Sequence, residues 1–331
     1  GAAMKKFLAI IPIILALFLA SCRAPEAPKS YSYKFGYVSE REDGLLESFI
    51  YDVEAKDDAY LESSLKPPFH LVGTGTYTLN VYRDADDPKL FKLETSFSFK
   101  GRYKFPADNT YSEEFEDSFT GISYMRVDAS SFEPVSMRKE YLVTIPSQDG
   151  IRRASYVVDV QYTKADGGFS VKSTVTDRQI EGLDEDDAIK VSNSKNADVT
   201  MELGGRVIDS QEQVFFALRL QKIGEGFTDS ITAYNPMDVL TQSISVHTES
   251  EKTVKKFGGK DYPCFQLSAS IMAQGLSAST AFFFTEAYPV KYLSGDGMEI
   301  AQNASLLLEI KQGDLLYTLK EYSNYAQKAP Q

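Results

Sequence analysis

Hydrophobic and polar side chains alternate with a period of two over most of the chain from His70 to Tyr322. In residues 91–100, Phe91, Leu93, Thr95, Phe97 and Phe99 alternate with charged residues and serines. This period predicts antiparallel strands that place one face on a core and the other in water. Further strands are predicted at 71–81, 116–127, 138–145, 153–163, 169–177, 240–248, 253–257, 264–272, 279–285, 290–293, 304–311 and 315–322.

One segment has helical spacing instead. Ser210 and Gln213 form a capping box, and the apolar stripe that follows consists of Val214, Phe215, Ala217 and Leu218. Gly224 is placed to end the helix. We therefore expect an amphipathic helix near 210–223.

The predicted strands fall into two groups. An acidic and serine-rich stretch, residues 181–198, separates an N-terminal β part at 31–180 from a C-terminal β part with the helix at 199–322. The segment 31–65 is harder to assign, and its portion 52–64 is expected to be a loop or a short helix. Gly73 and Gly75 interrupt a strand pattern, which favours a bulge or a bend.

The beginning of the chain has the layout of a secretory signal. Lys5 and Lys6 precede an apolar run at 7–20, and Leu19-Ala20-Ser21-Cys22 follows. The run is shorter than the roughly 20 residues of a membrane-spanning helix and contains Pro12. Residues 1–3, before Met4, look like an expression-vector remnant.

The cysteine directly after the small residues resembles the lipobox of bacterial lipoproteins. The resemblance implies that residues 1–21 are removed, that Cys22 carries a lipid, and that 22–30 is a tether outside the cytoplasm. A signal that is cleaved without lipid attachment is the alternative. Arg23 is not the aspartate that, by resemblance to enteric lipoproteins, signals retention in the inner membrane. In a Gram-negative envelope we therefore expect the periplasmic side of the outer membrane.

Composition narrows the possible partners. The formal net charge is −12, and loss of Lys5 and Lys6 with the signal makes it two units more negative. Such a chain is repelled by phosphate backbones, so nucleic acid is not expected as a partner, and the membrane is expected to be reached through the lipid. Cys264 lies in an apolar setting and is expected to be an inert buried thiol.

No pattern of catalytic or metal-binding residues is found. The two histidines, His70 and His247, are too few and too far apart for a zinc site, and no G-x-S-x-G motif presents a serine. The aspartate clusters at 84–87 and 184–187 lack the calcium-loop pattern and are interpreted as solvated turns. We therefore expect no cofactor, no metal and no enzymatic activity. A hydrolase with an unrecognised site remains an alternative.

Several short blocks lie between 128 and 308: FEPV at 132–135, FALR at 216–219, SISV at 243–246, YPCFQL at 262–267 and YPVKY at 288–292. These blocks resemble the DUF3108 group of bacterial exported proteins. The resemblance implies a β-rich envelope protein with strongly curved antiparallel sheets, arranged as a half-open barrel, and it brings no catalytic residues.

A helix laid against a curved sheet is also similar to envelope lipoprotein carriers of acyl chains. A half-open barrel lined by aromatic residues could shelter an apolar ligand, whereas in small barrels inward side chains usually fill the core. We hypothesise a non-enzymatic binding or assembly module for a hydrophobic ligand or an envelope partner; a scaffolding lipoprotein without a ligand site is the second hypothesis. The candidate groove residues are Val214, Phe215, Leu218, Phe97, Phe99 and Tyr77.

Overall fold

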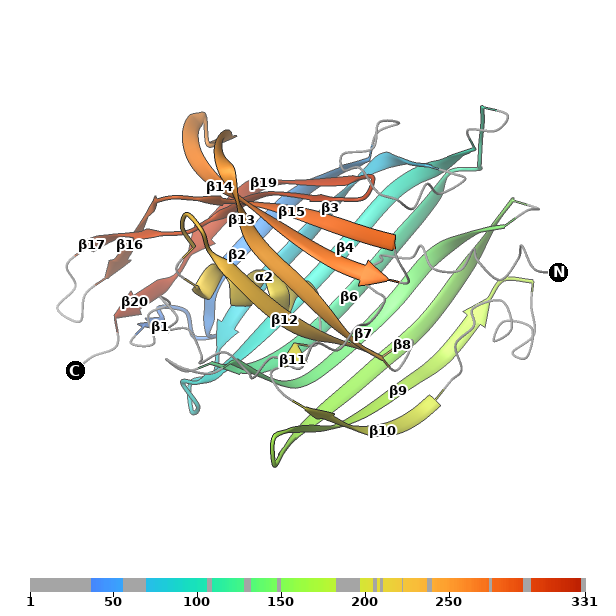
Figure 1. The fold of residues 1–331 in the computed structure, drawn as a ribbon, viewed down its shortest axis with the longest axis horizontal. Coiled ribbons are helices and arrows are strands. Elements are labelled where there is room, and N and C mark those ends of the chain that lie inside the picture. Colours follow the sequence, from blue (N-terminus) through green and yellow to red (C-terminus); the bar gives the residue numbers. More distant parts are fainter. Residues whose placement is uncertain are drawn as a thin grey trace.

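A computed structural model describes twelve segments of the chain (Figure 1). Cys22, the predicted signal peptide and the predicted tether lie outside them. No helix in the described segments is long and apolar enough to cross a membrane. The segments are 37–55, 70–105, 109–127, 132–147, 150–182, 197–204, 207–208, 211–221, 223–236, 240–273, 276–293 and 299–328.

The described residues are almost entirely strands, which confirms the predicted mainly β fold. The strands of the first half are β1 (Tyr37–Ser39), β2 (Leu45–Ala55), β3 (His70–Arg83), β4 (Leu90–Phe105), β5 (Thr110–Tyr111), β6 (Phe115–Val127), β7 (Phe132–Ser147), β8 (Gly150–Ala165) and β9 (Gly168–Ile180). The second half holds β10 (Ala197–Gly204), β11 (Val207–Ile208), β12 (Thr228–Asn235), β13 (Leu240–Phe257), β14 (Lys260–Ala273), β15 (Leu276–Thr285), β16 (Tyr288–Leu293), β17 (Glu299–Ala304), β18 (Leu307–Gln312), β19 (Leu315–Asn324) and β20 (Ala326–Lys328).

Among the described residues, sixteen strands form one open sheet. Its order is β10-β9-β8-β7-β6-β4-β3-β2-β19-β18-β15-β14-β13-β12-β11, with β5 beside β4. The β2–β19 pair joins the predicted parts 31–180 and 199–322 within this sheet, and most of the predicted boundary between them lies outside the described residues. A smaller sheet has the order β1-β20-β16-β17.

The large sheet curls so that its two ends face each other. In Figure 1, β3 to β9 form one broad layer, β12 to β15 cross over it, and helix α2 (Gln211–Leu220) lies between. The Ser173 hydroxyl on β9 and the Tyr234 hydroxyl on β12 are 2.6 Å apart in a buried hydrogen bond. The edge strands β10 and β11 do not pair with each other, so the barrel is half open, as the sequence predicts.

Glycines permit a close approach where β3 and β4 pair. Gly73 is directly opposite Gly101, and the Phe99 ring lies over both. A Cβ on Gly73 would stand 2.9 Å from Cζ of Phe99, and one on Gly101 would stand 2.7 Å from the Val72 carbonyl oxygen. The β3–β4 register is unbroken at this point. Gly73 and Gly75 therefore lie where the two strands approach closely in regular register, and the β3–β4 pair has no bulge there.

Three predicted assignments differ from the structure. Residues 52–55, predicted as a loop or short helix, end strand β2. The predicted strands 240–248 and 253–257 are one strand, β13, with an irregularity between Thr248 and Lys252. The predicted strand 304–311 is divided between β17 and β18.

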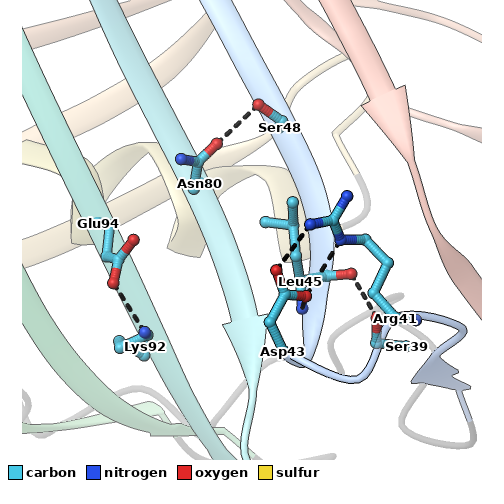
Figure 2. Close-up of polar contacts among 8 residues, drawn as sticks. All are labelled: Ser39, Arg41, Asp43, Leu45, Ser48, Asn80, Lys92 and Glu94. Carbon is cyan, nitrogen blue, oxygen red and sulfur yellow. Dashed lines mark hydrogen bonds and ion pairs between the residues drawn. The ribbon is translucent and has the colours of Figure 1, made fainter.

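The outer face of the sheet is polar, as the alternation predicts. Figure 2 shows this face on β2, β3 and β4, where Ser48 donates a 2.6 Å hydrogen bond to Asn80 and Lys92 pairs with Glu94 at 2.7 Å. In the turn that leads into β2, Arg41 binds the Asp43 carboxylate through two nitrogens. The exposed Arg41–Asp43 pair contributes little to stability.

Candidate functional site

Six aromatic side chains form a continuous row on the inner face of the large sheet. Each member pairs directly with the next across neighbouring strands, because the strand registers bring them to the same level. We call this set the aromatic row. It consists of Tyr51, Tyr77, Phe97, Phe119, Tyr141 and Tyr156, on β2, β3, β4, β6, β7 and β8.

Helix α2 covers one end of the aromatic row. Tyr51 and Tyr77 are each 2% exposed, and the Phe215 ring meets the Tyr77 ring edge-on with 6.3 Å between the centroids. The other four members are partly exposed. Their rings are in contact, with centroid distances of 5.2 Å for Phe97–Phe119, 5.7 Å for Phe119–Tyr141 and 4.8 Å for Tyr141–Tyr156.

The predicted groove residues all lie in one hydrophobic core or against it. Five of them are fully buried in one hydrophobic core, and Phe97 packs against that core while partly exposed. Tyr77 contacts Phe215 directly, and Phe97 stacks on Phe99 with 6.2 Å between the centroids. The covered end is therefore packed core, and the partly exposed end continues onto residues that the sequence did not single out. The buried five are Val214, Phe215, Leu218, Phe99 and Tyr77.

A buried ion pair holds the C-terminal end of the helix. Arg219 binds both carboxylate oxygens of Glu47 on β2, and the two side chains are 7% and 2% exposed. The Tyr322 hydroxyl donates a 2.6 Å hydrogen bond to the same carboxylate, and the Arg219 guanidinium stacks 4.9 Å from the Phe49 ring centroid. A cation in the last turn also interacts favourably with the helix dipole.

A second buried ion pair holds the N-terminal end. Lys139 Nζ on β7 lies 2.7 Å from Glu212 Oε2 in the first helical turn, and the side chains are 6% and 1% exposed. The ammonium also lies 5.2 Å from the centroid of the Phe119 ring. Each end of α2 thus has a charge that suits the helix dipole and that meets an opposite charge on the sheet.

Gly121 makes room for the Lys139 side chain. Thr95, Gly121 and Lys139 pair across β4, β6 and β7, one step along the strands from the aromatic row. A Cβ on Gly121 would stand 2.7 Å from Lys139 Cγ and 2.9 Å from Thr95 Oγ1. The lysine side chain therefore lies across the bare glycine toward Thr95. We call Thr95, Gly121 and Lys139 the polar row.

Asp117 is an unusual inner-face carboxylate near the exposed end of the aromatic row. It precedes Phe119 by two residues on β6, and burial raises its pKa to about 6, against the weaker opposing effects of Thr144 and Arg153. Thr144, which hydrogen-bonds Asp117, also accepts a 3.1 Å hydrogen bond from the Tyr103 hydroxyl through its carbonyl oxygen.

The titration of Asp117 predicts a pH-dependent stability. Because its pKa in the folded protein lies above the ordinary value of about 4, the folded chain binds more protons than the unfolded chain between about pH 4 and pH 6. The free energy of unfolding therefore falls as the pH rises through this window, by about 2 kcal/mol from this group. Urea unfolding of wild type and Asp117→Asn at pH 4, 5, 6 and 7 should show a smaller decline in the variant. Equal declines would contradict this assignment.

Among the described residues, neither histidine forms a catalytic triad. His247 Nε2 and the Ser268 hydroxyl both contact the Glu249 carboxylate, so the acid stands between the serine and the histidine. A triad needs the histidine between the other two. His70 Nδ1 is 3.7 Å from Asp314, and Cys264 is buried with its pKa raised to about 11 by that burial.

The comparisons with known proteins leave the family open. No family model and no curated protein matches the chain, so the resemblance to the DUF3108 group stays a prediction. A solved structure described as a beta-barrel-like protein of the domain of unknown function DUF1849 from Brucella abortus is similar to this chain. It is 12% identical, with a TM-score of 0.42, and the alignment covers 85% of this chain and 98% of that one.

Proposed function

We propose that this protein is a non-enzymatic binding module of the bacterial cell envelope, which is anchored through a lipid on Cys22 and holds a hydrophobic ligand on its concave face. The observation that carries the ligand proposal is the exposed half of the aromatic row: Phe97, Phe119, Tyr141 and Tyr156. Four contiguous, partly exposed aromatic rings on a curved inner surface form an apolar binding site of the kind that hydrophobic ligands use.

The packing around the helix supports the same function. The covered half of the row is filled by α2, so the ligand site is the uncovered half rather than a cavity beneath the helix. The two ion pairs hold α2 in one position and so fix the border between the halves. A pure scaffold would need no partly exposed aromatic surface on an inner face, and it is the second candidate.

Binding of N-phenyl-1-naphthylamine, an uncharged fluorophore that brightens in apolar surroundings, tests the ligand site. We expect saturable binding to the wild type and a loss of about tenfold in affinity for Tyr141→Thr, because the substitution removes a central ring of the exposed half. Threonine is favoured in strands, so β7 should be retained.

Leu142→Thr is the matched control. Leu142 is the next residue on β7, but it lies on the outer face and is 39% exposed. We expect it to bind the fluorophore as the wild type does. No saturable binding by the wild type, or equal losses in both variants, would favour the scaffold.

Mass spectrometry of the protein purified from its own host tests the envelope anchor. We expect a chain that begins at Cys22 with an added diacylglyceryl mass, and a Cys22→Ala variant without that mass. A wild-type chain that begins with an unmodified thiol would refute the lipid anchor while leaving the ligand site intact.

A further inference from the structure

A pocket of about 390 Å³ opens on the outer face of the large sheet, where β5 folds back along the end of β4. On this face Thr74 stands opposite Lys100, and Val72 stands opposite Arg102. The pocket is large enough for a small molecule and lies on the other side of the sheet from the concave face. The side chains that line it belong to Val72, Thr74, Lys100, Arg102, Tyr111 and Glu114.

Tyr111 provides an apolar surface at this pocket. It pairs with Lys104 across β5 and β4, which places both side chains on the outer face, and Lys104 Nζ lies 5.9 Å from the centroid of the Tyr111 ring. The tyrosine is 49% exposed, so half of this large side chain is in contact with water. An exposed aromatic ring can stack on a flat apolar surface of a ligand, such as the C–H face of a sugar ring or another aromatic ring.

The charges that line the pocket favour an anion. Lys100 Nζ is 2.8 Å from Oε1 of Glu114, and Arg102 Nη2 is 3.9 Å from Oε2, so one carboxylate faces two cations. The hydrogen bond from Lys100 lowers the pKa of Glu114, which is therefore ionised at neutral pH. Beside the pocket, the charges of Lys104 and Glu116 cancel. One positive charge remains, on a chain whose net charge is −12.

The hydrogen-bonding groups favour a ligand that has hydroxyls as well as an acid. Arg102 and Lys100 only donate, which suits a carboxylate or a phosphate. Glu114 only accepts and therefore needs a donor on the ligand, whereas the Thr74 hydroxyl can do either. A simple aryl acid has no donor for Glu114, and a neutral sugar has no anion for Arg102. A sugar ring that bears an acidic group has both, and its C–H face matches Tyr111.

We propose that this pocket binds an acidic saccharide, whose ring stacks on Tyr111 and whose carboxylate or phosphate is held by Arg102 and Lys100. This site is separate from the hydrophobic ligand site of the concave face. The Lys100, Arg102 and Glu114 side chains are 57%, 54% and 45% exposed, so the ligand is covered on one side only. The same pocket can therefore bind a free sugar acid or one unit of a longer acidic glycan.

Saturation-transfer difference NMR with defined sugars tests the class of ligand. D-glucuronate, glucose 6-phosphate and D-glucose are titrated separately into the purified protein at neutral pH and low salt. Because the charges of the pocket are exposed, we expect dissociation constants of about 1 mM for the two acidic sugars. Glucose should bind about tenfold more weakly, since it brings no anion to Arg102. Added salt should weaken the binding of the acidic sugars.

Arg102→Gln and Tyr111→Ser locate the site. Both residues are exposed, so we expect the fold and the binding of N-phenyl-1-naphthylamine to be unchanged. Arg102→Gln should weaken the acidic sugars about tenfold and leave glucose unchanged, whereas Tyr111→Ser should weaken all three. Arg126→Gln is the matched control and should bind as the wild type does. Arg126 lies on the outer face of β6, is 47% exposed, and pairs with Asp87 at 2.5 Å.

Three results would overturn the proposal: no binding of either acidic sugar, equal binding of glucose and the acidic sugars, or equal losses in Arg102→Gln and Arg126→Gln. Acidic-sugar binding that persists in Arg102→Gln and Tyr111→Ser would also overturn it, because the sugar would then lie elsewhere. A hyaluronan tetrasaccharide, which carries glucuronate within a chain, separates the two sources. Binding at least as tight as that of glucuronate identifies a glycan chain as the ligand, and weaker binding identifies the free sugar acid.

Discussion

Replacing Arg219 by leucine is expected to lower the free energy of unfolding by about 3–5 kcal/mol. The substitution leaves the Glu47 carboxylate buried at 1% exposure without its cation, with the Tyr322 hydroxyl still donating to it. A buried charge that loses its partner cannot recover its hydration. The midpoint of urea unfolding, followed by far-UV circular dichroism, measures the loss.

Lys320→Leu is the control for this experiment. Lys320 pairs with Asp52 at 3.2 Å across the neighbouring strands β19 and β2, but the two side chains are 54% and 59% exposed. We expect this substitution to cost less than about 1 kcal/mol, because exposed ion pairs contribute little. Equal effects at Arg219 and Lys320 would mean that the Arg219–Glu47 pair is accessible to water in solution.

Replacing Lys139 by methionine is expected to cost a similar amount, about 3–5 kcal/mol, because Glu212 then stays charged inside the protein. The double variant Lys139→Met, Glu212→Leu should recover to within about 1 kcal/mol of the wild type, since two apolar side chains of similar size replace a desolvated pair. Urea unfolding of the single variants and the double variant measures this interaction as a double-mutant cycle.

Arg138→Met is the control for the Lys139→Met substitution. Arg138 lies next to Lys139 on β7 but points to the outer face, where it pairs with Glu140 and Asp159. Arg138→Met should cost less than about 1 kcal/mol. Additive losses in the Lys139 and Glu212 double variant would show that the two charges do not stabilise each other.

How well the sequence predicts a strand depends on whether its inward-facing residues are apolar. Where these are mostly apolar, as on β4, the period of two predicts residues 91–100 of a strand that spans Leu90–Phe105. On β2 the inward series begins Glu47, Phe49, Tyr51, and the carboxylate breaks the apolar pattern. Its partner Arg219 is 172 positions away in the sequence, and no local sequence pattern shows that the two residues pair.

The aromatic site illustrates the same limit. Tyr77, Phe97 and Phe99 are recognisable as inward aromatics, and the apolar stripe of α2 is recognisable as the surface that packs on them. Phe119 and Tyr141 also lie in predicted strands, but their place in the row depends on strand register. Register depends on connections whose lengths the alternation does not determine. Glu212 and Arg219 stand seven positions apart on the helix, and their roles become visible once β2 and β7 are placed beneath them.

The pairing of β2 with β19 has a consequence for how the chain is made. An early strand and one of the last strands are immediate neighbours in the middle of the sheet. A chain that is synthesised or exported N-terminus first must keep the free side of β2 unpaired until nearly all of it has emerged. Such long-range closure is slow, and an exposed strand edge invites pairing with other chains. The free side of β2 is therefore open to aggregation until β19 pairs with it.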